Sequence, residues 1–523
     1  MYLIKKINKE YLLLVVFVVV FLATRLPGIY DDIVNPDAVN WHWRSEQFVV
    51  GLKYNQLDRT YQHYQPGTAL MWIVGPTVEL VKQFNGDVKY SQSSFLVFDY
   101  IAKIALIFVQ LTLSFLVIFL LAKLIDFNKA WLVTFIFSME PFFLANSRLL
   151  HLDILLTLLL FVGLLFVYLN LKKFNLYLGI LSGVFLALAF LTKSVAVGGL
   201  LFAIGVGGTY VLVKKGWEEA LQFVLSIFIP ALLAFIIFLP ALWVDAKDVL
   251  LGIYDGIERV GIRSGHNQII FGEATRDGGV WFYPLVFLLK TSPFLLLLLV
   301  LGLFNVKKPD FKAPSLNAFL TIFFVGYLIV MTIGSKKIDR YLLPIYPYLT
   351  LLAISGFYQL KEHIQTKFGA LGIGISVARV GTGILLVCFV SFVLYPFFNL
   401  YPYHFTYTNP LFGSPRYVHE NILAQKPFGV GVVALKDQIL KKYGYYPTLG
   451  FIDVKPMEAI YKASRVFDIR VDGTKNYDLL VLGVNEEIPQ KVLDSNYSWN
   501  LNHVMYINGL EYWKVYVKEA KSR

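Results

Sequence analysis

Several carboxylates lie in short polar segments between long apolar stretches. Their presence there is not explained by a need to keep the protein soluble. Asp37 follows Asn35-Pro36 and opens a helical stretch. Its carboxylate could cap that helix by accepting hydrogen bonds from free backbone N–H groups. Alternatively, it could be a general base that removes the proton of an acceptor hydroxyl. Asp31 and Asp32, in the same acidic segment, are the alternative positions for such a base.

The motif SRLLHLD places Arg148, His151 and Asp153 between two apolar stretches. Charged residues at membrane depth cost a few kcal/mol each and are usually retained for function. One interpretation is a polar belt at the membrane interface, with Arg148 extending toward water. The other gives Asp153 a role at an acceptor site, while Arg148 or His151 binds a phosphate.

Further cations, Lys193, Lys336, Lys337 and Arg340, lie at ends of apolar stretches where membrane topology does not require positive charge. Single residues of this kind can reach lipid headgroups, but that explains a cluster poorly. Lys and Arg bind phosphate through charge-assisted hydrogen bonds, which are stronger than neutral ones. We therefore expect a donor-phosphate site formed by Arg148, Lys193, Lys336 and Arg340.

The composition indicates that lipid surrounds much of the chain. Of 523 residues, 57% are hydrophobic and 16% are charged, and the mean hydropathy is +0.61. The apolar runs are near twenty residues long, which predicts membrane-spanning helices and excludes a barrel. The expected fold is mainly α, with about eleven transmembrane helices at residues 10–28, 96–122, 130–146, 153–171, 176–192, 195–213, 219–242, 282–304, 316–333, 342–359 and 378–398.

The short loops predict the orientation. With a cytoplasmic N-terminus, every short cytoplasmic loop is basic, as the positive-inside rule requires; one of them holds Lys307, Lys308 and Lys312. We predict a multi-pass plasma-membrane protein. Its outer face would carry two long loops, at about 29–94 and 245–279, with a helix over residues 37–54 in the first.

The second outer loop holds Arg263, His266 and Glu273, which we expect to contact an acceptor or to close over the site. Long loops without clear structure are often functional lids.

The composition changes after residue 400. We predict a helical membrane domain over 1–400 and a small extracytoplasmic α/β domain over 401–523. In the latter, residues 428–435 and 478–484 resemble buried strands, and 437–443 and 456–464 resemble helices.

Other function classes lack support in the sequence. The net charge of +12 comes mostly from cations between apolar runs, with no basic stripe among aromatic residues, so nucleic acid is not an expected partner. The single cysteine, Cys388, excludes an intramolecular disulfide. The scattered carboxylates show no diagnostic metal-ligand spacing, so we predict no cofactor, and a divalent cation has no support.

Several motifs occur in an order that resembles glycosyltransferase superfamily C, of the protein O-mannosyltransferase type and its relatives that transfer aminoarabinose to lipid A. The motifs are NPDAVNW, HYQPGTALMW, SRLLHLD, LTKS, WFYPLVFLLKTSP, KKIDRYLLP and YPYHFTYTNPLFGS.

The resemblance implies transfer of a sugar from a polyprenyl phosphate to an acceptor hydroxyl of a protein, glycan or lipid on the outer face. We therefore predict an inverting glycosyltransferase with Asp37 and Asp153 as catalytic carboxylates. The family often has an Asp-Glu pair in the first loop, whereas Ala38 follows Asp37 here, so Asp31 and Asp32 stay alternatives. The competing hypothesis is a transporter or flippase, for which polar residues at the bilayer midplane and inverted repeats are typical.

Overall fold

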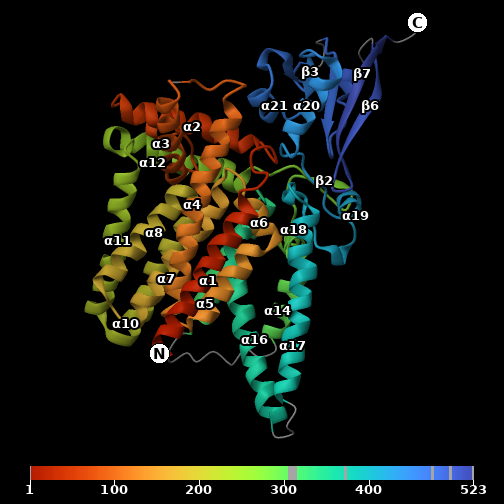
Figure 1. The fold of residues 1–523 in the computed structure, drawn as a ribbon. Helices are drawn as coiled ribbons and strands as arrows, with labels where there is room; N and C mark the ends of the chain where they lie inside the picture. Colours follow the sequence, from red (N-terminus) through yellow and green to blue (C-terminus); the bar gives the residue numbers. More distant parts are fainter. Residues whose placement is uncertain are drawn as a thin grey trace.

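A computed structural model describes residues 2–86, 88–303, 315–369, 374–472, 476–493 and 497–520. Most of the chain forms a helical bundle, and a smaller unit with a β-sheet lies at one end of it, called the sheet end here (Figure 1). Helix α1 begins at the opposite end of the bundle. The basic loop residues Lys307, Lys308 and Lys312 lie outside the described residues.

Every stretch expected to span the membrane is largely helical. The bundle consists of α1 (Tyr2–Arg25), α4 (Phe95–Ala122), α5 (Phe127–Met139), α6 (Pro141–Ser147), α7 (Leu152–Lys172), α8 (Leu176–Thr192), η2 (Ser194–Ala196), α9 (Val197–Phe202), η3 (Ala203–Gly207), α10 (Gly208–Lys215), α11 (Trp217–Phe238), α13 (Phe282–Lys290), α14 (Pro293–Leu303), α15 (Leu316–Ile333), η5 (Asp339–Ile345), α16 (Tyr346–Gly369), α17 (Gly374–Phe389), η6 (Val390–Leu394) and α18 (Tyr395–Asn399). Within the described residues, seven helices are long and apolar enough to cross a membrane, or up to eight if a bent pair counts as one.

Two of the expected spans are interrupted. The stretch 130–146 breaks at Glu140, whose ψ of 123° is not helical, because Pro141 starts a new helix there. Helices α13 and α14 are bent by 113°, with Pro293 as the first residue of α14. Each break lies at a charged residue shortly before a proline, within a stretch that is otherwise apolar.

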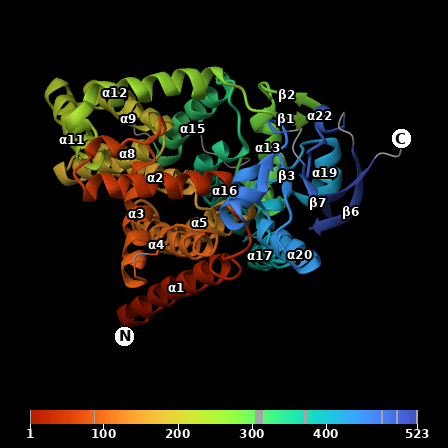
Figure 2. The same cartoon turned by 90° about the horizontal axis from the view of Figure 1, so that it is seen from above.

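The first long loop contains the predicted helix as α2 (Pro36–Lys53), followed by η1 (Leu57–Thr60) and α3 (Thr68–Phe84). Figure 2 shows α2 crossing over the bundle when seen from the sheet end. The second long loop contains α12 (Leu242–Gly256), η4 (Ile257–Arg263), and the hairpin of β1 (Gln268–Ile270) and β2 (Glu273–Thr275).

The C-terminal region has the expected α/β composition. Its five-stranded sheet has the order β4-β3-β5-β7-β6. The strands are β3 (Leu449–Phe451), β4 (Val466–Asp468), β5 (Leu479–Gly483), β6 (Tyr497–Ile507) and β7 (Leu510–Ala520), and the helical segments of the region are η7 (His404–Thr406), η8 (Pro410–Phe412), α19 (Pro415–Asn421), α20 (Val432–Tyr443), α21 (Val454–Ile460), η9 (Ala463–Arg465) and α22 (Gln490–Leu493). The inner strands β3 and β5 are parallel, whereas β7 pairs antiparallel with β5 and β6.

One of the two predicted strands is wrong. Residues 478–484 are confirmed as β5, but 428–435 form a turn that leads into α20. Gly429 and Gly431 have φ of 72° and 66°, so the chain turns before the valines of this stretch enter the helix. This turn is packed against the first long loop through a bridge between Ile33 and Val430.

Candidate active site

Asp37 lies in the first turn of α2, but it does not cap that helix. Asn35 is the N-cap residue, and its side chain accepts a hydrogen bond of 2.7 Å from the Ala38 N–H. The capping interpretation of Asp37 is therefore wrong, and its carboxylate is available for tertiary contacts. These contacts go to His151 and Arg340, both distant in the sequence.

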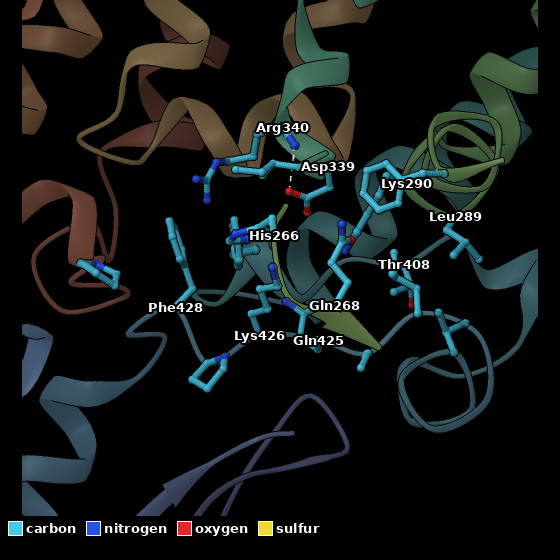
Figure 3. A pocket seen from close by; sticks show the side chains of 18 of the residues that line it. His266, Gln268, Leu289, Lys290, Asp339, Arg340, Thr408, Gln425, Lys426 and Phe428 are labelled. Carbon is cyan, nitrogen blue, oxygen red and sulfur yellow. Dashed lines mark hydrogen bonds between the residues drawn. The ribbon is translucent and has the colours of Figure 1, made fainter. Parts of the chain in front are cut away.

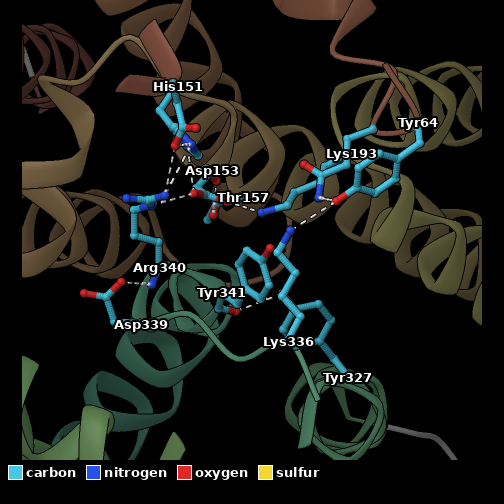
Figure 4. A network of polar contacts seen from close by, with 12 residues as sticks. Tyr64, His151, Asp153, Thr157, Lys193, Tyr327, Lys336, Asp339, Arg340 and Tyr341 are labelled. Atoms are coloured by element: carbon cyan, nitrogen blue, oxygen red, sulfur yellow. Dashed lines mark hydrogen bonds and ion pairs between the residues drawn. The ribbon is translucent and has the colours of Figure 1, made fainter. Parts of the chain in front are cut away.

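The site cluster consists of Asp37, His151, Asp153, Lys193 and Arg340. Figure 4 shows the last four of these residues. His151 lies between the two carboxylates, with Nε2 3.0 Å from Asp37 Oδ2 and Nδ1 2.8 Å from Asp153 Oδ2. It is the N-cap residue of α7 and has an extended backbone, and Asp153 lies in the first turn of the same helix.

Two cations complete the site cluster from the ends of other elements. Lys193 ends α8, and its Nζ donates a hydrogen bond of 2.7 Å to Asp153 Oδ1. Arg340 is the second residue of η5 and bridges both carboxylates, with Nη2 3.2 Å from Asp37 Oδ2 and Nε 3.3 Å from Asp153 Oδ2. These contacts bring together five residues from four separate segments.

The electrostatics of the site cluster favour an ionised Asp37 at neutral pH. Burial alone would raise its pKa, but the hydrogen bond from His151 and the charges of His151 and Arg340 hold the pKa below its usual value. For His151, burial lowers the pKa, but the charge of Asp153 and the hydrogen bonds to Asp153 and Asp37 together raise it by more, so the net shift is upward. An ionised carboxylate is the form that accepts a proton.

A cavity of about 410 Å³ opens beside Asp37 and Arg340. Figure 3 shows Arg340, His266, Lys290 and Lys426 around it. The remaining polar or charged lining residues are Asp37, Gln268, Lys336, Asp339, Thr408, Gln425 and Asp453.

Three lysines of this cavity, Lys290, Lys336 and Lys426, have no carboxylate partner among the described residues. The Lys290 ammonium donates to the carbonyl of Tyr407 at 2.9 Å, and that of Lys336 lies 3.4 Å from the Tyr64 hydroxyl. Burial lowers the pKa of Lys426 to about 8. Ammonium groups without a carboxylate partner favour binding of an anion in the cavity.

Lys426 and Phe428 were not identified from the sequence. They lie in the AQKPFG segment of the C-terminal region, where nothing about residue type or spacing distinguishes them from ordinary loop residues. His266, expected as an acceptor or lid residue, does line the cavity, and burial lowers its pKa to about 4. It is therefore neutral at physiological pH.

Arg148 and Asp32 do not join the site cluster. They belong to a second group, called the buried cluster, formed by His42, Asp99, Lys103, Asp32 and Arg148. Arg148 Nε donates to Asp32 Oδ2 at 3.0 Å, and the rest of its guanidinium donates to the carbonyls of residues 24, 25 and 27. Nη1 and Nη2 of Arg148 therefore both donate to backbone carbonyls, so we assign Arg148 a structural role.

Three other expected site residues lie away from the cavity. Asp31 is exposed, and so is Glu273 on β2. Arg263 ends η4 and forms an ion pair with Glu258. Among the described residues, no group of three or more His, Cys, Asp or Glu is arranged to hold a metal ion.

Comparisons with known proteins give a family for part of the chain. Residues 59–247 match the family model described as Dolichyl-phosphate-mannose-protein mannosyltransferase. No curated protein matches the chain.

Solved structures match over nearly the whole length. ArnT from Cupriavidus metallidurans in the apo state is similar with 13% identity and a TM-score of 0.51, covering 96% of this chain and 97% of that one. The same protein bound to undecaprenyl phosphate has 14% identity and a TM-score of 0.48, covering 97% and 98%. The Archaeoglobus fulgidus oligosaccharyltransferase in the apo form has 14% identity and a TM-score of 0.50, and the chain spans 87% of its own length and 64% of that protein.

The motifs predicted the same relationship that these matches give independently. The family match lies in the part that includes α3, α4 and α7, and the fold match includes the C-terminal region. The predicted resemblance to the protein O-mannosyltransferase type is thus confirmed as a resemblance over residues 59–247, and the chain is a polytopic membrane protein whose fold is similar to that of ArnT.

Proposed function

We propose that the protein is an inverting glycosyltransferase that transfers a sugar from a polyprenyl phosphate to an acceptor hydroxyl. The observation that carries this proposal is the position of Asp37: its ionised carboxylate opens into a cavity lined by lysines without carboxylate partners. The match of residues 59–247 to a family of dolichyl-phosphate-mannose-dependent transferases supports the donor class.

In the proposed reaction the acceptor oxygen attacks the anomeric carbon from the face opposite the phosphate. The bond between that carbon and the phosphate oxygen breaks, and its electron pair leaves with the polyprenyl phosphate. Asp37 takes the hydroxyl proton. His151 and Asp153 act as positioning residues, because the chain of contacts from Asp37 through His151 to Asp153 holds the base in place.

The leaving phosphate requires positive charge where its own charge develops. Lys336, Lys426 and Arg340 line the cavity and are the proposed phosphate ligands. Lys193 is bonded to Asp153 and does not line this cavity, so we assign it to positioning. Arg148 is assigned to structure for the reason given above.

We place the site on the extracytoplasmic side of the plasma membrane, with the N-terminus cytoplasmic and the C-terminal α/β unit outside. The basic short loops predict this orientation. In this arrangement residues 1–400 form the membrane domain and 401–523 cover its outer face.

The test is sugar transfer in membranes that contain the protein. Incubation with radiolabelled polyprenyl-phosphate sugars should label a protein, glycan or lipid acceptor, and Asp37→Asn should abolish labelling. Asp31→Asn is the matched control, since Asp31 is exposed and lies away from the cavity. Full labelling by Asp37→Asn would exclude Asp37 as the base, and no labelling by the wild-type protein with any donor would reject the proposed reaction.

A further inference from the structure

The turn that precedes α20 has an unusual backbone at three of four positions. Phe428 has φ of 46°, Gly429 of 72° and Gly431 of 66°. Glycine adopts this left-handed region readily, but phenylalanine disfavours it. A bulky residue persists in such a conformation only where its surroundings impose it, and these positions cluster at functional sites.

The surroundings of this turn come from both parts of the molecule. On one side, the Gly431 N–H donates to the Asp32 carbonyl at 3.0 Å, and the Val34 N–H donates to the Gly429 carbonyl at 3.2 Å. A Cβ at Gly429 would overlap the Val34 carbonyl oxygen. The turn is thus fixed to the backbone just before Asn35-Pro36-Asp37.

On the other side, the sheet holds the same turn through adjacent residues of β7. The Trp513 indole Nε1 donates to the Val430 carbonyl at 2.8 Å. The Tyr512 hydroxyl donates to the Lys426 carbonyl at 3.0 Å. Both side chains are almost fully buried, so the sheet and the turn form one packed unit.

The Phe428 side chain points from this turn to the site cluster. The Arg340 guanidinium carbon lies 4.4 Å from the centre of its ring, and the Phe405 ring stacks behind it at 5.1 Å with an interplanar angle of 16°. Arg340 therefore lies between an aromatic face and the two carboxylates, Asp37 and Asp153. A cation held over an aromatic face is stabilised, most strongly where water is excluded.

We propose that residues 426–431 are a clamp by which the C-terminal sheet positions Asp37 and Arg340, with Phe428 as the positioning residue for Arg340. Through its backbone the clamp holds the loop that carries Asp37, and through the Phe428 ring it holds the guanidinium. This assigns the C-terminal region a direct part in the reaction. The inference depends on the proposed function for its kinetic test, but its structural test does not.

The structural test uses the bridge between Ile33 and Val430, whose side chains are buried. Directly opposed residues in antiparallel pairs have Cβ atoms close enough for a disulfide. In a Cys388→Ser background, Ile33→Cys with Val430→Cys should crosslink on mild oxidation. Each single variant is the control. A double variant that is folded but remains reduced would overturn the clamp, whatever its transferase activity.

The kinetic test distinguishes an effect of the aromatic face of Phe428 from an effect of its side-chain volume. Phe428→Leu should lower kcat by about tenfold, the scale of a desolvated cation–π contact. Phe428→Tyr keeps the face and should retain kcat within about twofold. Phe467→Leu is the matched control, because Phe467 lies on β4, its ring packs on Tyr477, and it does not line the cavity.

The outcomes distinguish the two proposals. Equal losses in Phe428→Leu and Phe428→Tyr, or full activity in Phe428→Leu, would reject the positioning role while leaving the glycosyltransferase proposal intact. Trp513→Phe, which removes the donor to the Val430 carbonyl together with part of a buried ring, should also lower kcat, and combining it with Phe428→Leu should give less than the product of the single effects. Strictly multiplicative effects would show that the sheet does not act through Phe428.

Discussion

The site cluster and the buried cluster are built from the same residue types and have different accessibility. Each contains two aspartates, a histidine, a lysine and an arginine. The Asp37 side chain is 39% exposed and lines a cavity, whereas that of Asp32 is 4% exposed. None of the five side chains of the buried cluster lines the cavity at Asp37. Residue types alone therefore do not distinguish a reactive group from a structural one in this fold.

The partners of the cations explain the difference. In the buried cluster, Lys103 and Arg148 donate to backbone carbonyls of residues 24–33 as well as to carboxylates. This fixes the chain that leads from α1 toward α2. In the site cluster, Arg340 and Lys193 bond mainly to Asp37 and Asp153, and the cavity beside them holds further lysines. The buried cluster therefore fixes the loop between α1 and α2, whereas the site cluster lies beside a cavity.

The largest effect on kcat is expected at Asp37, the proposed general base of the site cluster. Asp37→Asn should lower kcat by about 10²- to 10⁴-fold, the range typical of a lost general base, while the melting temperature stays near that of the wild type. Steady-state transfer rates and thermal unfolding in detergent measure the two quantities. A large drop in melting temperature would place Asp37 with the structural residues instead.

The opposite pattern is expected for Asp32→Asn. Removing one partner of a buried ion pair leaves Arg148 and Lys103 with less compensation, which costs about 3–5 kcal/mol in buried pairs. Yield of monodisperse protein and melting temperature should fall, while kcat per folded molecule changes little. Replacing both partners, Asp32→Asn with Arg148→Met, should be less damaging than Asp32→Asn alone; an equal or greater loss contradicts the structural assignment.

A smaller effect is expected for a cavity lysine. Lys426→Met should raise the donor KM by about tenfold, as for a charge-assisted contact of roughly 1.4 kcal/mol. Burial lowers the pKa of Lys426 to about 8, so its ammonium is charged below that pH and lost above it. The wild-type donor KM should therefore rise as the pH rises through about 8, with bound phosphate moving the change upward. The variant should lack this component, and an unchanged pH profile would exclude Lys426 as a ligand.

The smallest effect is expected for Arg263, whose partner is Glu258 and which does not line the cavity. Arg263→Ala should leave kcat and both KM values within about twofold, because exposed ion pairs contribute at most about 1 kcal/mol. A rise in acceptor KM of more than about twofold would support the original prediction that the second long loop contacts the acceptor.

Much of the membrane architecture was predictable because hydropathy is a local property. Each expected span is largely helical, and α2 appears where it was expected. The convergence of Asp37, His151, Asp153, Lys193 and Arg340 was also predictable, since polar residues at the ends of neighbouring spans lie at the same depth. The bend at Pro293 and the break at Glu140 were not predicted, because the average hydropathy stays high across both stretches even though a proline marks each one.

The sequence by itself determined the helical bundle, the level at which the charges meet and the superfamily to which the motifs point, since length, apolar content and loop charge decide these locally. Only the tertiary structure decided that Asp37 faces a cavity while Asp32 is enclosed, that Arg340 rather than Arg148 joins it, and that Lys426 and Phe428 arrive from the C-terminal region. The physical reason is that burial and ion pairing depend on which distant segments pack together, and no local pattern encodes those partners.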